Sequence, residues 1–177
     1  MAFTGAPLDL IKTVAAVLML GDHINSALLE PPALLVWRFG RIAFPLFCFV
    51  LASHIARGMD ARTQVVRLLV FGALTQPIFN AAFPWSPREA NILFTLAAGA
   101  ALAQGLADRS SWAQHVTFAV GALVIWWWPA LARTGVDFGL TGILFPAALA
   151  LLLRRQWLHG FWVLVLLFAL NYGAKAA

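Results

Sequence analysis

Long apolar runs, separated by short polar or helix-breaking segments, follow one another along the whole chain. Runs near 20 residues match the length of helix that crosses the hydrocarbon core of a bilayer, about 30 Å thick. The pattern predicts about seven helices, at 9–29, 34–56, 64–83, 90–107, 112–132, 137–153 and 157–172. Because 62% of the 177 residues are hydrophobic and 11% are charged, the expected fold class is an all-α integral membrane protein. We expect one polytopic bundle, in a single domain over 1–177.

The distribution of positive charge predicts how such a bundle is oriented. If successive helices alternate in direction, one side carries Lys12, Arg57, Arg62, Arg67, Arg109, Arg154 and Arg155. The other side carries Arg88, Arg133 and Lys175. Since basic residues favour the cytoplasmic side, the N-terminus is expected in the cytoplasm and the C-terminus outside. The scattering of these residues over helix ends argues against nucleic acid as a partner, despite the net charge of +5. The partner that fits is the lipid bilayer.

Lys12 and His23 share the first apolar run, where an ionisable side chain costs a few kcal/mol in hydrocarbon. Eleven residues of helix advance about 16 Å and turn about 1100°, so the two side chains lie within roughly 20° of one face. Asp22 and His23 also make this run unlike the apolar core of a cleaved signal, and we expect it to remain as a membrane helix. Ionisable residues in such a place favour a functional role.

Several polar groups fall in the same predicted leaflet, opposite the N-terminus. They are Asp22, His23, Asn25, Arg38, Arg41, Gln76, Asn80, Asn91, Thr95, Asp137 and Thr141. Leaving them unpaired in lipid would cost several kcal/mol per group, so one convergent polar cavity is expected. The alternative for any single group is a contact with headgroups or a structural hydrogen bond between helices.

The residue types in this cavity favour acyl transfer. A neutral His23 can take a proton from an amine or hydroxyl nucleophile, or carry the acyl group itself, with a carboxylate to orient it. Asp22 points about 100° away from His23 on a helix, so Asp137 is at least as plausible for that role. Arg38 and Arg41 suit an anion or the oxyanion, and Asn91, Thr95, Gln76 and Asn80 are candidates for contacts with the acceptor or the thioester.

The opposite end of the bundle suits a phosphorylated acyl carrier. Lys12 and Arg57, with the other basic residues of that side, could hold the phosphates of coenzyme A. The distance of about 16 Å from Lys12 to His23 is comparable with an extended pantetheine arm. No metal is expected, because His54, His115 and His159 have no ligand-type residue four positions on. The single cysteine, Cys48, is predicted to pack in an apolar run.

Several segments carry a resemblance to a known family. Residues 8–23 with 40–47, and later 91–95 and 137–142, resemble the TraX family of membrane proteins. The spacing from Lys12 to His23 is also similar to the basic-x10-His motif of larger membrane acyltransferases. The resemblance implies acetyl transfer from acetyl-CoA in the bacterial inner membrane, with pilin or another envelope molecule as acceptor. It puts His23 in the active site, Lys12 at the basic position and Arg41 in the glycine-arginine segment.

The sequence therefore predicts an acetyl-CoA-dependent membrane acetyltransferase. Two other classes of function remain open at this point. A small proton-coupled transporter could use the same buried Asp, His and Arg side chains as a relay. A non-catalytic assembly partner for pili or other envelope structures would use them only to lock helices together.

Overall fold

The computed structural model describes residues 5–30, 32–84, 89–107, 109–127, 138–154 and 156–173. These ranges contain seven α-helices, a short 3₁₀ turn and no β-strand. The elements are α1 (Ala6–Leu28), α2 (Leu34–Ala56), α3 (Ala61–Ala82), α4 (Ile92–Ala107), α5 (Ser111–Trp127), α7 (Gly139–Leu153), η1 (Trp157–His159) and α8 (Gly160–Gly173). The all-helical class and the number of helices are as predicted. The predicted residues 128–132 and 137 lie outside the described ranges.

Two predicted helix starts are wrong by three residues, because hydropathy does not detect capping. The first helix begins at Ala6 rather than at residue 9, since Pro7 is tolerated in the first turn, where its missing N–H costs nothing. The third begins at Ala61 rather than at residue 64, because the Asp60 side chain accepts a hydrogen bond from the Arg62 backbone N–H at 3.0 Å. The last run opens as η1 before α8 begins.

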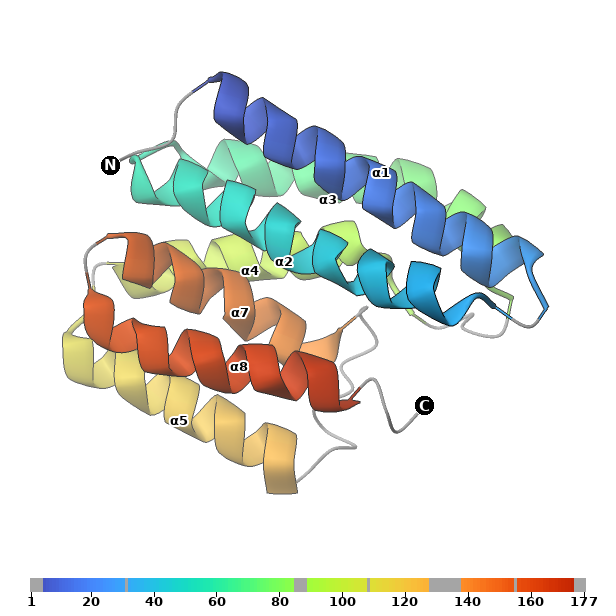
Figure 1. Ribbon diagram of the computed structural model, residues 1–177. Helices are drawn as coiled ribbons and strands as arrows, with labels where there is room; N and C mark the ends of the chain where they lie inside the picture. The colour runs from blue at the N-terminus through green and yellow to red at the C-terminus, as the bar shows by residue number, and fades with distance from the viewer. Residues whose placement is uncertain are drawn as a thin grey trace.

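The helices lie side by side, and consecutive ones run in opposite directions (Figure 1). Helix α7 occupies the middle of the bundle and packs against α2, α4, α5 and α8, whereas α1 packs mainly on α2. Alternation brings the beginning of α1 to the same end of the bundle as the ends of α2 and α7 (Figure 1). The end of α1 and the beginning of α2 lie at the other end, whereas α7 begins nearer the middle of α2, where Phe138 stacks on Phe44 (Figure 1).

Small residues allow the central helices to approach closely. Ala52, Ala100, Ala147 and Ala148 are completely or almost completely buried. A β-carbon on Gly99 of α4 would overlap the ring of Pro146 on α7. This fit brings the middle of α7 against α4, and Phe138 just before α7 reaches α2, where the functional site described below is formed.

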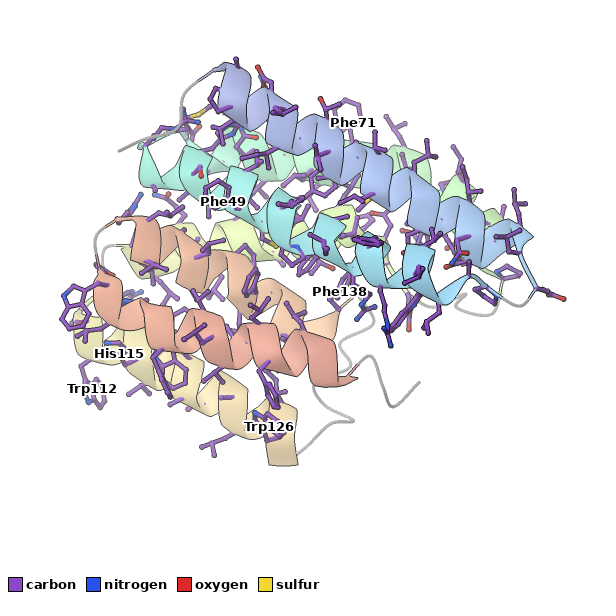
Figure 2. The ribbon with its side chains drawn as sticks, viewed as in Figure 1. Phe49, Phe71, Trp112, His115, Trp126 and Phe138 are labelled. Carbon is purple, nitrogen blue, oxygen red and sulfur yellow. The ribbon has the colours of Figure 1, made fainter. Side chains whose placement is uncertain are left out.

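The outer surface of the bundle is strongly apolar. Phe71 on α3 and Trp112 on α5 point away from the core, whereas Phe138 lies where α2 meets the start of α7 (Figure 2). By length and hydropathy, α2 and α3 could each cross a bilayer, and the apolar α4, α7 and Trp157–Leu170 are shorter. The predicted crossing by all seven helices stays a prediction.

Candidate functional site

A cavity of about 90 Å³ lies between α1 and α2, toward the end of the bundle where α1 finishes, and beside the residue that precedes α7. Helices α1 and α2 supply most of its lining. The first residue of α4 and the residue that precedes α7 complete it. The lining residues are Met19, Asp22, His23, Gly40, Arg41, Ala43, Phe44, Ile92 and Phe138. The structure thus brings together three of the predicted site residues, Asp22, His23 and Arg41. They face an apolar wall, which consists of Phe44, Ile92 and Phe138.

The turn between α1 and α2 fixes the position of His23. Asn25 is buried, and its Oδ1 accepts a hydrogen bond of 2.7 Å from the backbone N–H of Ala33, the residue that precedes α2. The His23 ring lies edge-on to the Phe83 ring, with centroids 5.1 Å apart. His23 and Asp22 are both half-buried. The imidazole is therefore held at the cavity by its own helix, by the turn and by the end of α3.

Asp22 is enclosed by the close approach of α1 to α2. Its Oδ1 atom is buried and has no hydrogen-bond partner among the residues the structure describes. Its carboxylate interacts electrostatically with His23 and with Arg41. A buried carboxylate oxygen that has no donor among the described residues is available to a donor on a bound molecule.

Arg41 connects α2 to α8. Its Nη2 donates a hydrogen bond of 3.4 Å to the carbonyl oxygen of Leu170 on α8. Its guanidinium carbon also lies 5.4 Å from the centroid of the Trp37 ring and 4.9 Å from that of Phe138. Contacts of this kind are attractive because the ring faces are electron-rich. They orient the guanidinium beside the cavity.

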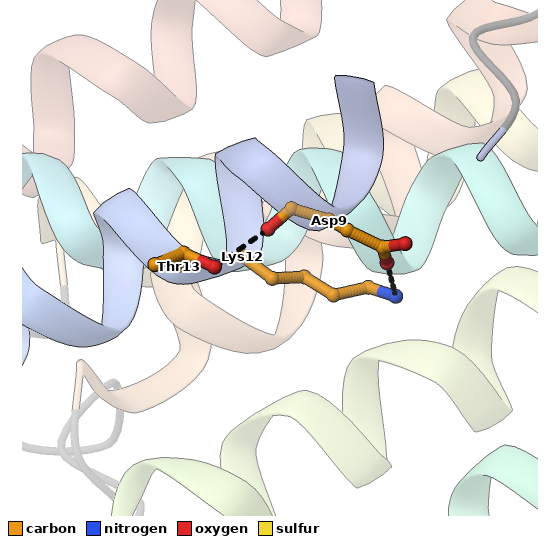
Figure 3. Close-up of polar contacts among 3 residues, drawn as sticks. All are labelled: Asp9, Lys12 and Thr13. Atoms are coloured by element: carbon orange, nitrogen blue, oxygen red, sulfur yellow. Dashed lines mark hydrogen bonds and ion pairs between the residues drawn. The ribbon is translucent and has the colours of Figure 1, made fainter. Parts of the chain in front are cut away.

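Lys12 lies about 16 Å from His23 along α1, since each residue of helix rises 1.5 Å. Its Nζ forms an ion pair of 2.9 Å with Asp9 Oδ1, and the Thr13 hydroxyl donates to the Asp9 carbonyl (Figure 3). Arg57 donates from Nε to the Ser53 carbonyl at the end of α2. Lys12 and Arg57 both act electrostatically on His54. The two predicted phosphate-binding residues thus share one end of the bundle, opposite the cavity.

The predicted polar residues of α3 and α4 form a separate network. Gln76 donates to Asn80 Oδ1 and accepts from the Asn91 backbone N–H, at 2.8 and 2.9 Å. Asn91 donates to the Gly72 carbonyl and to the Thr75 hydroxyl, and Thr95 is fully buried. None of Gln76, Asn80, Asn91 and Thr95 lines the cavity. The expectation of a single convergent polar cavity is therefore corrected, because these groups largely satisfy one another.

Two further predicted residues lie elsewhere. Arg38 is exposed on the first turns of α2 and does not line the cavity. Asp137 lies outside the described residues, so its role beside His23 stays a prediction. Its neighbour Phe138 does line the cavity.

The apolar wall was not predicted from the sequence. The wall consists of Phe44, Ile92 and Phe138, none of which carries a titratable group. Residue types that commonly act in catalysis therefore do not point to them. All three nevertheless lie in segments that carry the family resemblance, 40–47, 91–95 and 137–142. That placement is the signal that could have found them.

The fold and this cavity define a class: an all-helical bundle with a histidine, a carboxylate and an arginine grouped at one end. Comparison with known sequences gives the family, because residues 7–176 match the pattern described as TraX protein. The chain belongs to the TraX family.

Curated relatives agree with this assignment. Protein TraX of Escherichia coli is 36% identical over 152 residues, which cover 84% of this chain and 57% of that protein. Protein TraX of Escherichia coli strain K12 is 34% identical over the same shares. A probable fimbrial assembly protein FimC, serogroup H1, of Dichelobacter nodosus is 26% identical over 79% of this chain and 60% of its own. The chain thus spans somewhat more than half the length of these relatives. No solved structure matches it.

Proposed function

We propose that this chain is a membrane-embedded acetyltransferase that moves an acetyl group from acetyl-CoA to an amine or hydroxyl acceptor. The observation that carries the proposal is the grouping of His23, Asp22 and Arg41 around one cavity. A base, a carboxylate that stabilises its protonated form and a fixed positive charge are the groups that acyl transfer requires.

His23 acts as the general base. Its neutral imidazole takes the proton of the amine or hydroxyl while that group attacks the thioester carbonyl. The carbon–sulfur bond then breaks, and the proton passes from His23 to the departing sulfur, so that free coenzyme A and the acetylated acceptor leave. Arg41 stabilises the negative oxygen that forms during the attack. Asp22 stabilises the imidazolium, a role that Asp137 could share.

The donor is held mainly at the other end of the bundle. Lys12 and Arg57 supply positive charge for the phosphates of coenzyme A, and about 16 Å of helix separates Lys12 from His23. Arg38 binds a further anionic group at the cavity end. Asn91, Thr95, Gln76 and Asn80 do not line the cavity, so the proposal assigns them no contact with the acceptor or the thioester.

The bacterial inner membrane is the proposed location, with the N-terminus in the cytoplasm. Two helices of spanning length, α2 and α3, and the apolar outer surface support a position in a bilayer. Pilin or another envelope molecule is the proposed acceptor, which is supported by the fimbrial assembly name of one relative. The proposed topology puts the C-terminus outside. A reporter fused after Ala177 that is active only in the cytoplasm would therefore refute it.

The test of the reaction is incubation of the purified protein in detergent with radiolabelled acetyl-CoA. We expect release of coenzyme A, which His23→Ala abolishes. Lys12→Ala should raise KM for acetyl-CoA and leave kcat largely unchanged, since it removes binding to a distant part of the donor. Equal activity of His23→Ala and the unmodified protein, at equal thermal stability, would exclude the mechanism.

One relative's name favours a second candidate, a non-catalytic partner in fimbrial assembly. In that case the polar groups serve only to hold the helices together. Cells that carry His23→Ala would then assemble pili normally, provided that the variant is as stable as the unmodified protein, and no acetylated acceptor would be found by mass spectrometry of the envelope.

A further inference from the structure

The apolar wall of the cavity centres on two stacked aromatic rings. Phe44 and Phe138 lie nearly parallel, with an angle of 10° between the ring planes and 4.2 Å between centroids. Phe44 is almost completely buried, and behind it lies Phe145, with centroids 6.4 Å apart. The Phe44 ring therefore has little room to move, because Phe145 supports it from within the core.

The chain holds Phe138 in an unfavourable backbone conformation. Its φ is +61°, in the left-handed region, and it alone among the described residues other than glycine has a positive φ. A bulky side chain there costs on the order of 1 kcal/mol or more and persists only where surrounding contacts enforce it. The contacts are the stack on Phe44 and the Arg41 guanidinium over the ring. Strain of this kind at a cavity indicates that the position of the ring matters.

The size of the cavity limits what can enter. Its volume is about 90 Å³. A protein cavity of roughly 150 Å³ lined by aliphatic and aromatic side chains accepts benzene, with six heavy atoms. In proportion, this cavity accepts roughly four heavy atoms, which is the size of an acetyl group together with the thioester sulfur. A longer acyl chain would press on the apolar lining, in which Phe44 and Phe138 are the largest side chains.

We infer that the stacked pair of Phe44 and Phe138 sets the upper limit on the acyl group at this site, at about two or three carbons. The inference rests on the proposed acetyltransferase function and adds the residues that decide chain length. The same rings line the space beside His23 and Arg41, so a longer chain would also displace the thioester carbonyl from these two groups.

The experiment compares acetyl-CoA, propionyl-CoA, butyryl-CoA and hexanoyl-CoA with the full chain purified in detergent. Release of coenzyme A is measured with glycinamide as the amine acceptor, and the shift in melting temperature is measured with each donor in the absence of acceptor. The variants are Phe44→Ala and Phe138→Gly. The second removes a ring while it relieves the left-handed backbone, since glycine adopts positive φ freely. Phe118→Ala is the matched control, because Phe118 is equally buried and does not line the cavity.

The unmodified protein should favour acetyl over butyryl by at least about tenfold, since one methylene in an apolar pocket is worth roughly 10-fold or more. In Phe44→Ala and Phe138→Gly that preference should fall to within a few-fold, and Phe118→Ala should keep it. Equal use of all four donors by the unmodified protein, or the same change in Phe118→Ala, would overturn the inference. If no donor releases coenzyme A, the proposed function fails. The dependence of the melting shift on chain length then decides by itself whether the rings limit the acyl group.

Discussion

Gly40 of α2 lies against Asp22 of α1 so closely that a β-carbon at position 40 would overlap the Asp22 side chain. The contact involves Asp22 Cβ as well as its carboxylate, so a rotation of the side chain does not relieve it. Because Asp22 and His23 are neighbours, this one glycine sets the distance between the cavity-lining ends of α1 and α2. Hydrophobicity alone would not require a glycine there.

Gly40→Ala should therefore damage both the fold and the site. Forcing a methyl group into this contact costs about 1–3 kcal/mol and moves α1 away from Arg41. Gly21→Ala is the matched control on the same pair of helices, because its nearest neighbour, Val36 Cγ1, would lie at an ordinary 3.9 Å. Gly21→Ala should stabilise the protein by up to about 1 kcal/mol, because alanine favours a helix more than glycine does. Thermal melting in detergent and release of coenzyme A measure both effects, and equal behaviour of the two variants would contradict the packing argument.

Arg41→Lys should lower kcat for acetyl transfer by about 10²-fold, the cost of removing one preorganised donor from an oxyanion site. A lysine keeps the charge but cannot place a planar group over both Trp37 and Phe138. Arg38→Lys, on the exposed surface of the same helix, should change kcat little. A similar loss in both variants would show that the fixed geometry of Arg41 beside the cavity has no special part in the reaction.

Asn91→Ala should destabilise the protein by about 1–3 kcal/mol, because it removes the buried hydrogen bond to the Gly72 carbonyl and leaves the Leu93 N–H without its side-chain acceptor. Asn80→Ala should have a smaller effect, since Asn80 is exposed and Gln76 keeps its bond to the Glu89 carbonyl. Thermal melting separates the two variants. If Asn91 instead contacts a substrate, KM would rise in Asn91→Ala without any change in melting temperature.

Asp60 predicts a dependence of stability on pH. The Arg62 backbone N–H and the Thr63 hydroxyl donate to its carboxylate, and these bonds hold the pKa of Asp60 below the usual 3.8. A lowered pKa in the folded state means that the carboxylate stabilises α3 above pH 3.8, and that this stability is lost as the pH falls through the folded-state pKa. Asp60→Ala should melt below the unmodified protein at pH 7, and the difference should shrink toward pH 3.

Asp60→Asn serves as the control for that measurement. Asparagine is as good a helix cap as aspartate and does not titrate, so the melting temperature of Asp60→Asn should exceed that of Asp60→Ala by the same amount at pH 7 and pH 3. A difference between Asp60→Ala and the unmodified protein that remains constant from pH 7 to pH 3 would show that the charge on Asp60 contributes nothing.

The helices themselves could be predicted from sequence because their determinants are local. The run 34–56 coincides with α2, and the spacing of Lys12 and His23 along one helix follows from the rise per residue. The grouping of Asp22, His23 and Arg41 was also predictable, since α1 and α2 are consecutive and short turns make consecutive helices antiparallel neighbours.

What only the tertiary structure decided is which polar groups meet and what encloses them. Gln76, Asn80 and Asn91 had the same predicted depth as His23, yet they bond to one another between α3 and α4. Phe138 is distant in sequence from Phe44 and Arg41, and only the packing of α7 against α2 brings it to the cavity. Sequence fixes position along a helix axis through 1.5 Å per residue, whereas rotation and neighbours are chosen by side-chain packing over the whole bundle.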